Sequence, residues 1–414
     1  MNRLTTPWGE FGLTRFPEHP RDPLRAWDTA DEYLLRHLGG ADGTDTGAEP
    51  GTEHEAGRGT PEGAAEAVDL SGAVVVLGDR WGALTTPVAA HRLERLVTGP
   101  LVQLTDSYLT QRATRANLRR AGVGQDAARL LSVRDTPPER MDVLLVRVPK
   151  SLALLEDQLH RLAPAVHAGT VVVGTGRVTE IHTSTLRLFE RILGPTRTSL
   201  AVRKSRLIFC APEAGREAAP NPWPHRYPLP ADAGPVSGRT VVNHAGIFCA
   251  ERLDIGTRFF LRHLPRRRGS EHVVDLGCGN GVIGTAAALD NPAARVTFID
   301  ESFSAVASAE ATFRSNVATG APAEFLLGDG LADVPAATVD LVLNNPPFHA
   351  HQATTDATAW RMFTGSRAAL RPGGELWVVG NRHLGYHAKL RRLFGNCETV
   401  AGDPKFVVLR AVKR

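Results

Sequence analysis

The sequence of 414 residues predicts an α/β protein with two similar halves in tandem. From residue 70 onward, short apolar runs alternate with helical stretches. Each half contains an apolar run that enters a glycine-containing turn, VVVLGDRWGAL at 74–84 and VVDLGCGNGVIG at 273–284. A second matching pair, VLLVRVPK at 143–150 and LVLNNPPF at 341–348, follows farther along each half. Because both pairs occur in the same order, we interpret the first half as a divergent duplicate of the second.

The boundary between the halves is predicted at residues 218–238. This segment has six prolines and no hydrophobic periodicity, which is typical of a semi-rigid linker. It separates an N-terminal domain at 1–217 from a C-terminal domain at 239–414. Within the first domain, residues 39–67 are rich in Gly, Ala, Thr and Glu. They cannot bury enough apolar surface to offset the entropy of ordering, so we expect a disordered insertion there.

Buried strands are expected in both halves from their β-branched and apolar runs. In the N-terminal half they are predicted at 73–77, 141–146 and 170–174. In the C-terminal half they are predicted at 272–276, 295–300 and 324–329. An acid lies at or near the end of each of the latter three strands, namely Asp275, Asp300 and Asp329. Ligands bind beyond the carboxyl ends of such parallel strands, so these acids predict a binding site.

The tetrapeptide Asn345-Pro346-Pro347-Phe348 directly follows an apolar strand. Its residue types suit a planar exocyclic amine, which is a poor nucleophile until its lone pair is exposed. The Asn345 side-chain oxygen and the Pro346 carbonyl can accept its two N–H groups, and Pro347 stiffens the backbone between them. Phe348 offers an aromatic face for stacking. The segment indicates amine methylation, provided that a methyl donor binds nearby.

The glycine-rich turn Gly277-Cys-Gly-Asn-Gly281 predicts that donor site. Glycines let the backbone pass close to a ligand. Asp275 suits a methionine amino group, Asp300 a ribose and Asp329 an adenine amine. The spacing Gly279-x-Gly-x-x-Gly284 also satisfies a dinucleotide fingerprint, so NAD or FAD stays open on the loop alone. The three acids and the downstream tetrapeptide favour S-adenosyl-L-methionine.

The chain resembles bacterial class I methyltransferases that modify guanine N2 in ribosomal RNA. The resemblance rests on residues 244–264, 273–303 and 341–414, and on DPLRAWDTADEYLL, VPKSLALLEDQL and HTSTLRLFERILGPT in the N-terminal half. The stretch from AWRMFTGSRAALRPGG to KFVVLRAVK is most similar to the large-subunit (23S rRNA) members, and small-subunit (16S rRNA) members are near relatives. The main departure is the insertion at 39–67.

This resemblance implies two tandem class I, Rossmann-like methyltransferase domains, the N-terminal one degenerate. The C-terminal one would have a seven-stranded, mostly parallel sheet ending in an antiparallel hairpin. It implies transfer of a methyl group from S-adenosyl-L-methionine to N2 of one guanosine in 23S rRNA. It assigns the amine site to Asn345, Pro346, Pro347 and Phe348. It assigns the cofactor site to Gly256, Thr257, Asp275, Gly277, Gly279, Gly281, Asp300, Asp329 and Asn345.

Other substrates remain open from the residues themselves: 16S rRNA, adenine N6, or a protein glutamine. A catalytically idle RNA-binding assembly factor is a further alternative. The N-terminal half lacks both motifs, so we expect it to recognise RNA. Two basic clusters are its candidate phosphate contacts. They comprise Arg112, Arg115, Arg119 and Arg120, and Arg203, Lys204 and Arg206.

The net charge of +4 and isoelectric point near 9.0 permit a polyanionic partner without requiring one. The four cysteines are far apart and form no CxxC pair, which argues against zinc or a disulfide framework and for a reducing compartment. The sequence has no apolar run of membrane-spanning length and no signal-peptide pattern at its start. We therefore expect a cytoplasmic monomer that binds neither metal nor membrane.

Overall fold

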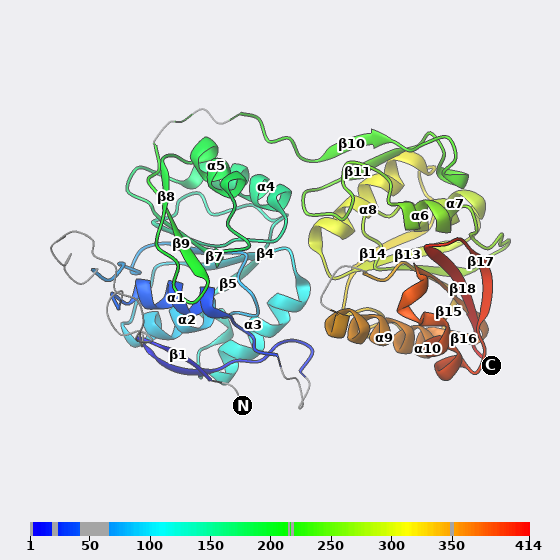
Figure 1. Cartoon of the computed structure of the whole chain (residues 1–414), viewed down its shortest axis with the longest axis horizontal. Helices are drawn as coiled ribbons and strands as arrows, with labels where there is room; N and C mark the ends of the chain where they lie inside the picture. Colours follow the sequence, from blue (N-terminus) through cyan, green and yellow to red (C-terminus); the bar gives the residue numbers. More distant parts are fainter. Residues whose placement is uncertain (1–2, 19–23, 42–65, 214–215, 217–218, 348–351) are drawn as a thin grey trace, which may run out of the picture. The chain divides into compact units, whose positions relative to one another are not determined.

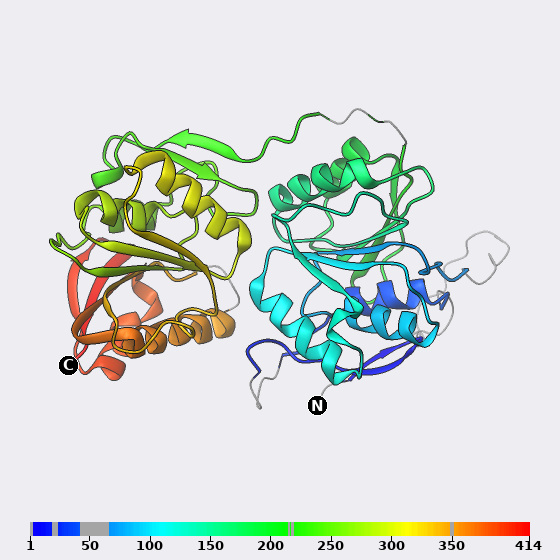
Figure 2. The same cartoon turned by 180° about the vertical axis from the view of Figure 1, so that it is seen from behind.

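The computed structural model describes residues 3–18, 24–41, 66–213, 216, 219–347 and 352–414, with side chains from 357 in the last range (Figures 1 and 2). The chain forms two compact units. The first comprises Met1–Thr105 and Leu109–Asn221, and the second comprises Asp106–Tyr108 and Pro222–Arg414. Most of the predicted disordered insertion, and Phe348 of the predicted amine site, lie outside the described residues.

The second unit is built on a seven-stranded sheet in the order β14-β13-β12-β15-β16-β18-β17. Neighbours from β14 to β16 pair in parallel, and β18 pairs antiparallel with both β16 and β17. The sheet strands are β12 His272–Leu276, β13 Arg295–Asp300, β14 Ala323–Leu327, β15 Val339–Asn344, β16 Leu370–Asn381, β17 Glu398–Gly402 and β18 Phe406–Val412. The predicted mostly parallel sheet with an antiparallel hairpin is confirmed.

Helices cover both faces of this sheet because its central strands are apolar on both sides. On one face the core includes Phe260 from α6, Ala286 from α7 and Phe313 from α8. On the other face it includes Phe363 from α9 and Leu390 from α10. The helices are α6 Ile255–Leu261, α7 Val282–Asp290, α8 Phe303–Asn316, α9 Gln352–Ala369 and α10 Tyr386–Phe394, with short 3₁₀ turns at Gly234–Val236 and Arg382–Leu384.

The first unit repeats this architecture with the order β5-β4-β3-β6-β7-β9-β8. Its sheet strands are β3 Val74–Leu77, β4 Leu101–Thr105, β5 Arg129–Ser132, β6 Val143–Arg147, β7 Val171–Arg177, β8 Thr196–Thr198 and β9 Ser205–Cys210. Its helices are α1 Thr29–Leu38, α2 Thr85–Glu94, α3 Tyr108–Arg120, α4 Leu152–Leu162 and α5 Thr183–Ile192, with 3₁₀ turns at Gln125–Ala127 and Ala163–Ala165 and a separate hairpin of β1 Arg3–Thr6 and β2 Gly9–Gly12.

The two units match strand by strand. In the first unit, helices α1 to α3 pack on one face of the sheet and helices α4 and α5 on the other. In the second unit, helices α6 to α8 and helices α9 and α10 are divided between the two faces in the same way. The central pairs also share their register: Leu77 pairs with Val146 in β3–β6, and Leu276 pairs with Asn344 in β12–β15. The predicted tandem fold is therefore confirmed, and Arg147 of the first unit occupies the position of Asn345 in the second.

The segment expected to be a linker has more structure than its prolines suggest. Strand β10, His225–Pro228, pairs antiparallel with β11, Thr240–Asn243. Leu229, Ala233 and Val236 between them are buried in the core of the second unit together with Phe260. The polar side chains of α8 accept hydrogen bonds from the β11 backbone, for example Thr312 Oγ1 from Val242 N at 3.0 Å. The apolar residues between the prolines anchor this segment to the second unit. They were not recognised in the sequence because they follow neither a helical nor a strand period.

Candidate active site

The candidate site lies where the neighbouring strands β13, β12 and β15 end in the second unit. The turn after β12 is tied to β13 because Gly277 N donates to Ile299 O at 2.8 Å. It is tied to β15 because Asn344 Nδ2 donates to Leu276 O at 2.7 Å. Asn344 is fully buried. Nothing in the sequence marks Asn344, because it looks like an ordinary strand end, yet its hydrogen bond joins the two predicted motifs.

The glycines of this turn have different structural roles. Gly279 has a φ of +52°, and a Cβ there would meet no described residue within 4 Å apart from its chain neighbours, so the space beside it is open. Gly281 has a φ of +72°, and a Cβ there would lie 2.6 Å from Ala309 Cα in α8. A Cβ at Gly256 would approach Phe406 at 3.0 Å. Gly279 therefore leaves room for a ligand, whereas Gly281 and Gly256 allow helices to pack closely.

Asp275 lies behind the turn and is completely buried. Its Oδ2 accepts a hydrogen bond from Gly284 N at 2.7 Å, and its Oδ1 has no partner among the described residues. Burial raises the pKa of Asp275 to about 8, the hydrogen bond from Gly284 lowers it, and the nearby Asp300 raises it. An unpartnered buried carboxylate oxygen costs stability unless a ligand supplies a donor.

The raised pKa of Asp275 predicts a pH-dependent stability. The pKa of an unfolded aspartate is about 3.9, so between that value and about 8 the folded state holds one more proton. The free energy of unfolding therefore falls as pH rises through this window. We expect Asp275→Asn to make this decrease less steep, by at most about 1.4 kcal/mol per pH unit. Urea denaturation of the wild type and of Asp275→Asn from pH 5 to pH 8 measures this slope. The expectation is contradicted if the free energy of unfolding depends on pH equally in the two proteins.

The other two predicted acids are already engaged by the protein. Asp300 Oδ2 accepts from Gly279 N and Oδ1 from Ser302 N, both at 3.0 Å. Burial raises the pKa of Asp300, while the backbone N–H groups lower it. Asp329 lies two residues beyond β14 and forms an ion pair of 3.2 Å with Arg361 of α9. Arg361 was not predicted, since its position inside a helix gives no sign that it reaches a strand end.

Asn345 follows β15 and contacts helix α6. Its Nδ2 donates to Thr257 Oγ1 at 3.0 Å, and its Oδ1 is buried without a partner among the residues that the structure describes. Thr257 Oγ1 lies 3.2 Å from Asp254 Oδ2, which also accepts from Thr257 N at 2.8 Å. Pro346 is buried and Pro347 is exposed. The structure thus brings Asn345 and Thr257 together and leaves one amide oxygen available.

In the first unit, the equivalent positions carry charges that fill the corresponding space. Arg147 is fully buried and pairs with Asp31 at 3.2 Å and with Asp28 and Glu180 at 2.8 Å. Arg80, at the position of Gly279, pairs with Asp28 at 3.4 Å and Glu180 at 3.0 Å. Burial raises the pKa of Asp31 to about 7, and the Arg147 guanidinium lowers it. This ion cluster stands where the second unit has its open site.

The arginines suggested as RNA contacts divide into two groups. Arg120 donates to Glu18 Oε1 at 2.6 Å and to Thr14 Oγ1 at 2.9 Å, so it ties down an N-terminal segment. The Arg112 guanidinium lies 4.9 Å from the ring centroid of Phe16. Arg203 pairs with Glu32 at 3.5 Å, and Arg206 is partly buried. Arg119 and Lys204 are exposed and Arg115 is partly exposed.

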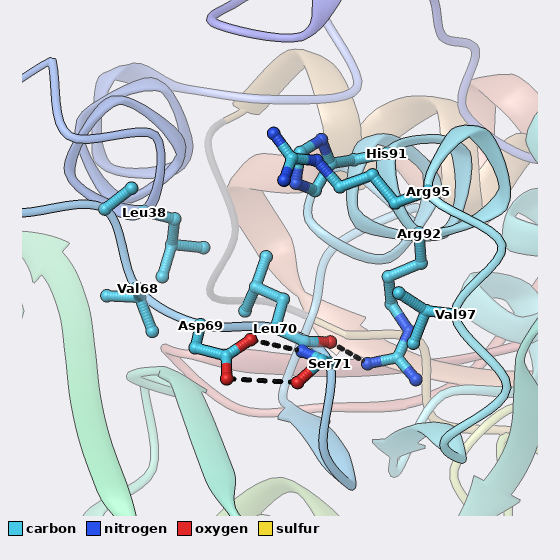
Figure 3. A pocket seen from close by; sticks show the side chains of 10 residues that line it. Leu38, Val68, Asp69, Leu70, Ser71, His91, Arg92, Arg95 and Val97 are labelled. Carbon is cyan, nitrogen blue, oxygen red and sulfur yellow. Dashed lines mark hydrogen bonds between the residues drawn. The ribbon is translucent and has the colours of Figure 1, made fainter.

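A separate hollow of about 460 Å³ lies in the first unit beside α2 (Figure 3). Two of its polar side chains are hydrogen-bonded within the protein: Asp69 accepts from Ser71 N at 2.9 Å, and Arg92 donates to the carbonyls of Leu70 and Gly72. Among the residues placed by the structure there is no metal-binding group of His, Cys, Asp and Glu, and no helix is long and apolar enough to cross a membrane.

Two family descriptions match the chain. RLMG N-terminal domain matches residues 1–49 and 62–214, and Methyltransferase small domain matches residues 238–410. Ribosomal RNA large subunit methyltransferase G of Streptomyces avermitilis is 69% identical over 411 residues, 99% of each chain. A protein of the same name from Ectopseudomonas mendocina is 45% identical over 414 residues, 100% of each chain.

The fold is also similar to a solved structure, T. thermophilus 16S rRNA N2 G1207 methyltransferase (RsmC) in complex with AdoMet and guanosine. The TM-score is 0.70 at 20% identity, covering 100% of this chain and 98% of that chain. This likeness shows the fold alone, whereas the full-length identity to the curated relatives confirms the predicted family. The chain belongs to the ribosomal RNA large subunit methyltransferase G family and is a methyltransferase.

Proposed function

We propose that the protein transfers a methyl group from S-adenosyl-L-methionine to the exocyclic N2 amine of one guanosine in 23S rRNA. The observation that carries this proposal is Asn345 Oδ1, which directly follows β15 and is a buried acceptor with no partner in the described part of the chain. It lies on the strand next to β12, whose turn leaves open space beside Gly279. The names of the full-length relatives support the rRNA of the large subunit as substrate.

The residues of the turn fit S-adenosyl-L-methionine. When bound, this cofactor supplies an electrophilic methyl group on a sulfonium sulfur. The open space beside Gly279 suits a ligand close to the backbone, and Asp275 Oδ1 is a buried acceptor that an ammonium group would satisfy. Asp300 and Asp329 keep acceptor capacity beyond their present bonds, since a carboxylate can accept about four hydrogen bonds. We assign these residues, with Gly277, to cofactor binding.

The two glycines of the turn give a test of this assignment. Gly279→Ala adds a methyl group to space that the protein leaves open, at a backbone cost of about 1–2 kcal/mol for the positive φ. We expect it to weaken cofactor binding more than tenfold, measured by calorimetry. Gly281→Ala is the matched control because its methyl group collides with Ala309 in α8. It should lower the melting temperature more than Gly279→Ala does. Unchanged cofactor affinity in Gly279→Ala would contradict the assignment.

The residues after β15 would act on the amine by orientation. Asn345 Oδ1 and the Pro346 carbonyl would each accept one N–H group of guanine N2, which fixes the amine with its lone pair exposed. Phe348 is proposed to stack on the ring, although it lies outside the described residues. No general base is needed, because the amine becomes acidic once methylated and can release its proton to water. A paired target base would have to leave its stack to reach this site.

The first unit is proposed to recognise the RNA. Its equivalent of the active site is filled by the Arg147 cluster, so cofactor binding there is disfavoured. Arg119 and Lys204 are its best candidates for phosphate contacts among the predicted clusters, because both are exposed and form no ion pair with the residues that the structure describes. A cytoplasmic location and a monomeric state complete the proposal, as both suit an enzyme that meets rRNA during ribosome assembly.

Incubation with S-[methyl-³H]adenosylmethionine tests the function. Ribosomal RNA from a strain lacking the gene, free and in ribosomal particles, is compared with DNA and with total protein. We expect label only in 23S rRNA, and N2-methylguanosine after nucleoside analysis. Label in 16S rRNA, adenine or protein would instead support the corresponding alternative substrate. Absence of label on every substrate, with cofactor and RNA binding intact, would support a binding role.

A further inference from the structure

The hydroxyl of Thr257 sits between a carboxylate and the amide of Asn345. Thr257 Oγ1 is 3.2 Å from Asp254 Oδ2 and 3.0 Å from Asn345 Nδ2. Helix α6 fixes this arrangement, because Asp254 caps the helix and accepts from Thr257 N at 2.8 Å. Thr257 and Asn345 are 88 positions apart in the sequence. The contact therefore joins the start of one helix to the end of a central strand.

The donors and acceptors in this chain permit one orientation of the Asn345 amide. A carboxylate accepts but does not donate, so the single hydroxyl proton of Thr257 goes to Asp254. The hydroxyl oxygen is then left to accept, and Asn345 must turn its NH₂ group toward it. Asn345 Oδ1 consequently faces away, and it is the atom that is buried with no partner from the described residues. A flipped amide would present N–H groups to a substrate amine, which offers N–H groups itself.

The first unit shows the same two positions in contact with different side chains. Asp31 is the third residue of α1 as Thr257 is of α6, and Arg147 stands at the position of Asn345. Arg147 Nε donates to Asp31 Oδ1 at 3.2 Å. The fold thus brings these positions together in both units. Only in the second unit does the pair leave an acceptor atom available.

We propose that Thr257, held by Asp254, is a positioning residue that sets the Asn345 amide with its oxygen toward the substrate amine. This inference rests on the proposed function, and it departs from the expectation that Thr257 binds the cofactor. According to this proposal, Thr257 acts through Asn345, and the Thr257 hydroxyl touches no substrate atom. Removal of the hydroxyl would leave the amide free to rotate, so a fraction of the enzyme would present NH₂ to the substrate.

Thr257→Val tests the proposal because it keeps the shape of the side chain and removes the hydroxyl. Thr257→Ser is the matched control that keeps the hydroxyl. At saturating cofactor and rRNA, we expect single-turnover methylation to fall about 10- to 100-fold in Thr257→Val and to stay within about threefold of wild type in Thr257→Ser. Cofactor affinity by calorimetry should change less than about threefold in both. If Thr257→Val is poorly folded, Thr257→Ala replaces it in the same comparison.

Two outcomes overturn the proposal while leaving the function intact. One is a wild-type rate in Thr257→Val, and the other is a large loss of cofactor affinity with an unchanged rate at saturation, which would make Thr257 a cofactor ligand. A separate readout needs no activity: the Asn345 side-chain NH₂ signals in an ¹⁵N-asparagine spectrum, identified by their absence in Asn345→Ala. We expect slow exchange with water in the wild type and in Thr257→Ser and faster exchange in Thr257→Val. Equal exchange in all three overturns the proposal, even if rRNA proves not to be the substrate.

Discussion

Replacement of Asn345 by Ala is expected to lower methyl transfer by about 10²–10³-fold or more. The change removes the buried oxygen that is proposed to orient the amine, and it removes the amide that contacts Thr257. The cofactor residues around Gly279 and Asp300 are untouched, so cofactor affinity should remain near that of the wild type. Single-turnover labelling of rRNA measures the first quantity and calorimetry the second.

Asn345→Asp is the informative companion to this variant. It keeps an acceptor for the amine but places a second acceptor against Thr257 Oγ1, which would then have to turn its proton away from Asp254. We expect its rate to lie between those of Asn345→Ala and the wild type. Near-normal activity of Asn345→Ala would show that this residue does not orient the substrate and would remove the main support for the proposed site.

Replacement of Arg147 by Met is expected to give the largest loss of stability, about 3–5 kcal/mol for the first unit. Met fills much of the same space but leaves Asp31 fully buried without its guanidinium partner. Because burial already raises the pKa of Asp31 to about 7, its loss of Arg147 should raise the pKa further. The folded state would then hold this proton to higher pH, so the destabilisation should grow as pH increases toward and above 7.

Hydrogen exchange under mild denaturant measures this effect separately in each unit, since a chain with two domains need not unfold in one step. Arg191→Met is the control, because Arg191 forms an ion pair with Glu156 while its side chain is 54% exposed. Exposed pairs of this kind contribute about 0–1 kcal/mol. Restoration of stability by Asp31→Leu in the Arg147→Met background would support the mechanism. Equal stability of Arg147→Met and Arg191→Met would contradict it.

Much of the fold could be predicted because local patterns carry it. The apolar runs at 273–276 and 341–344 are fully buried central strands, and such runs are recognisable without any neighbour. The turn glycines were also recognisable, although their separate roles were not. Whether a glycine leaves space for a ligand or for Ala309 of a distant helix depends on packing, which no local pattern records.

The parts that sequence could not supply are contacts between distant residues. Arg120 looked like one member of a basic helix face, but Glu18 and Thr14 occupy it. The proline-rich segment looked like a spacer because its few apolar residues have no period, although Leu229 and Val236 are buried. Asp254, Thr257 and Asn345 each have an evident local role as helix cap, helix residue and strand end. Their joint effect on one amide emerges only from the fold.

The Arg147 cluster also bears on how the first unit can change over evolutionary time. Each charge in it depends on the others: an Asn at position 147 would remove the guanidinium that Asp28, Asp31 and Glu180 share, and Arg80 contacts Asp28 and Glu180 but not Asp31. A single substitution toward the pattern of the second unit would therefore lower stability before any catalytic group is regained. Several coordinated replacements would be needed together. We therefore expect this cluster to change only through linked substitutions, which constrains the core of the first unit more tightly than its exposed surface.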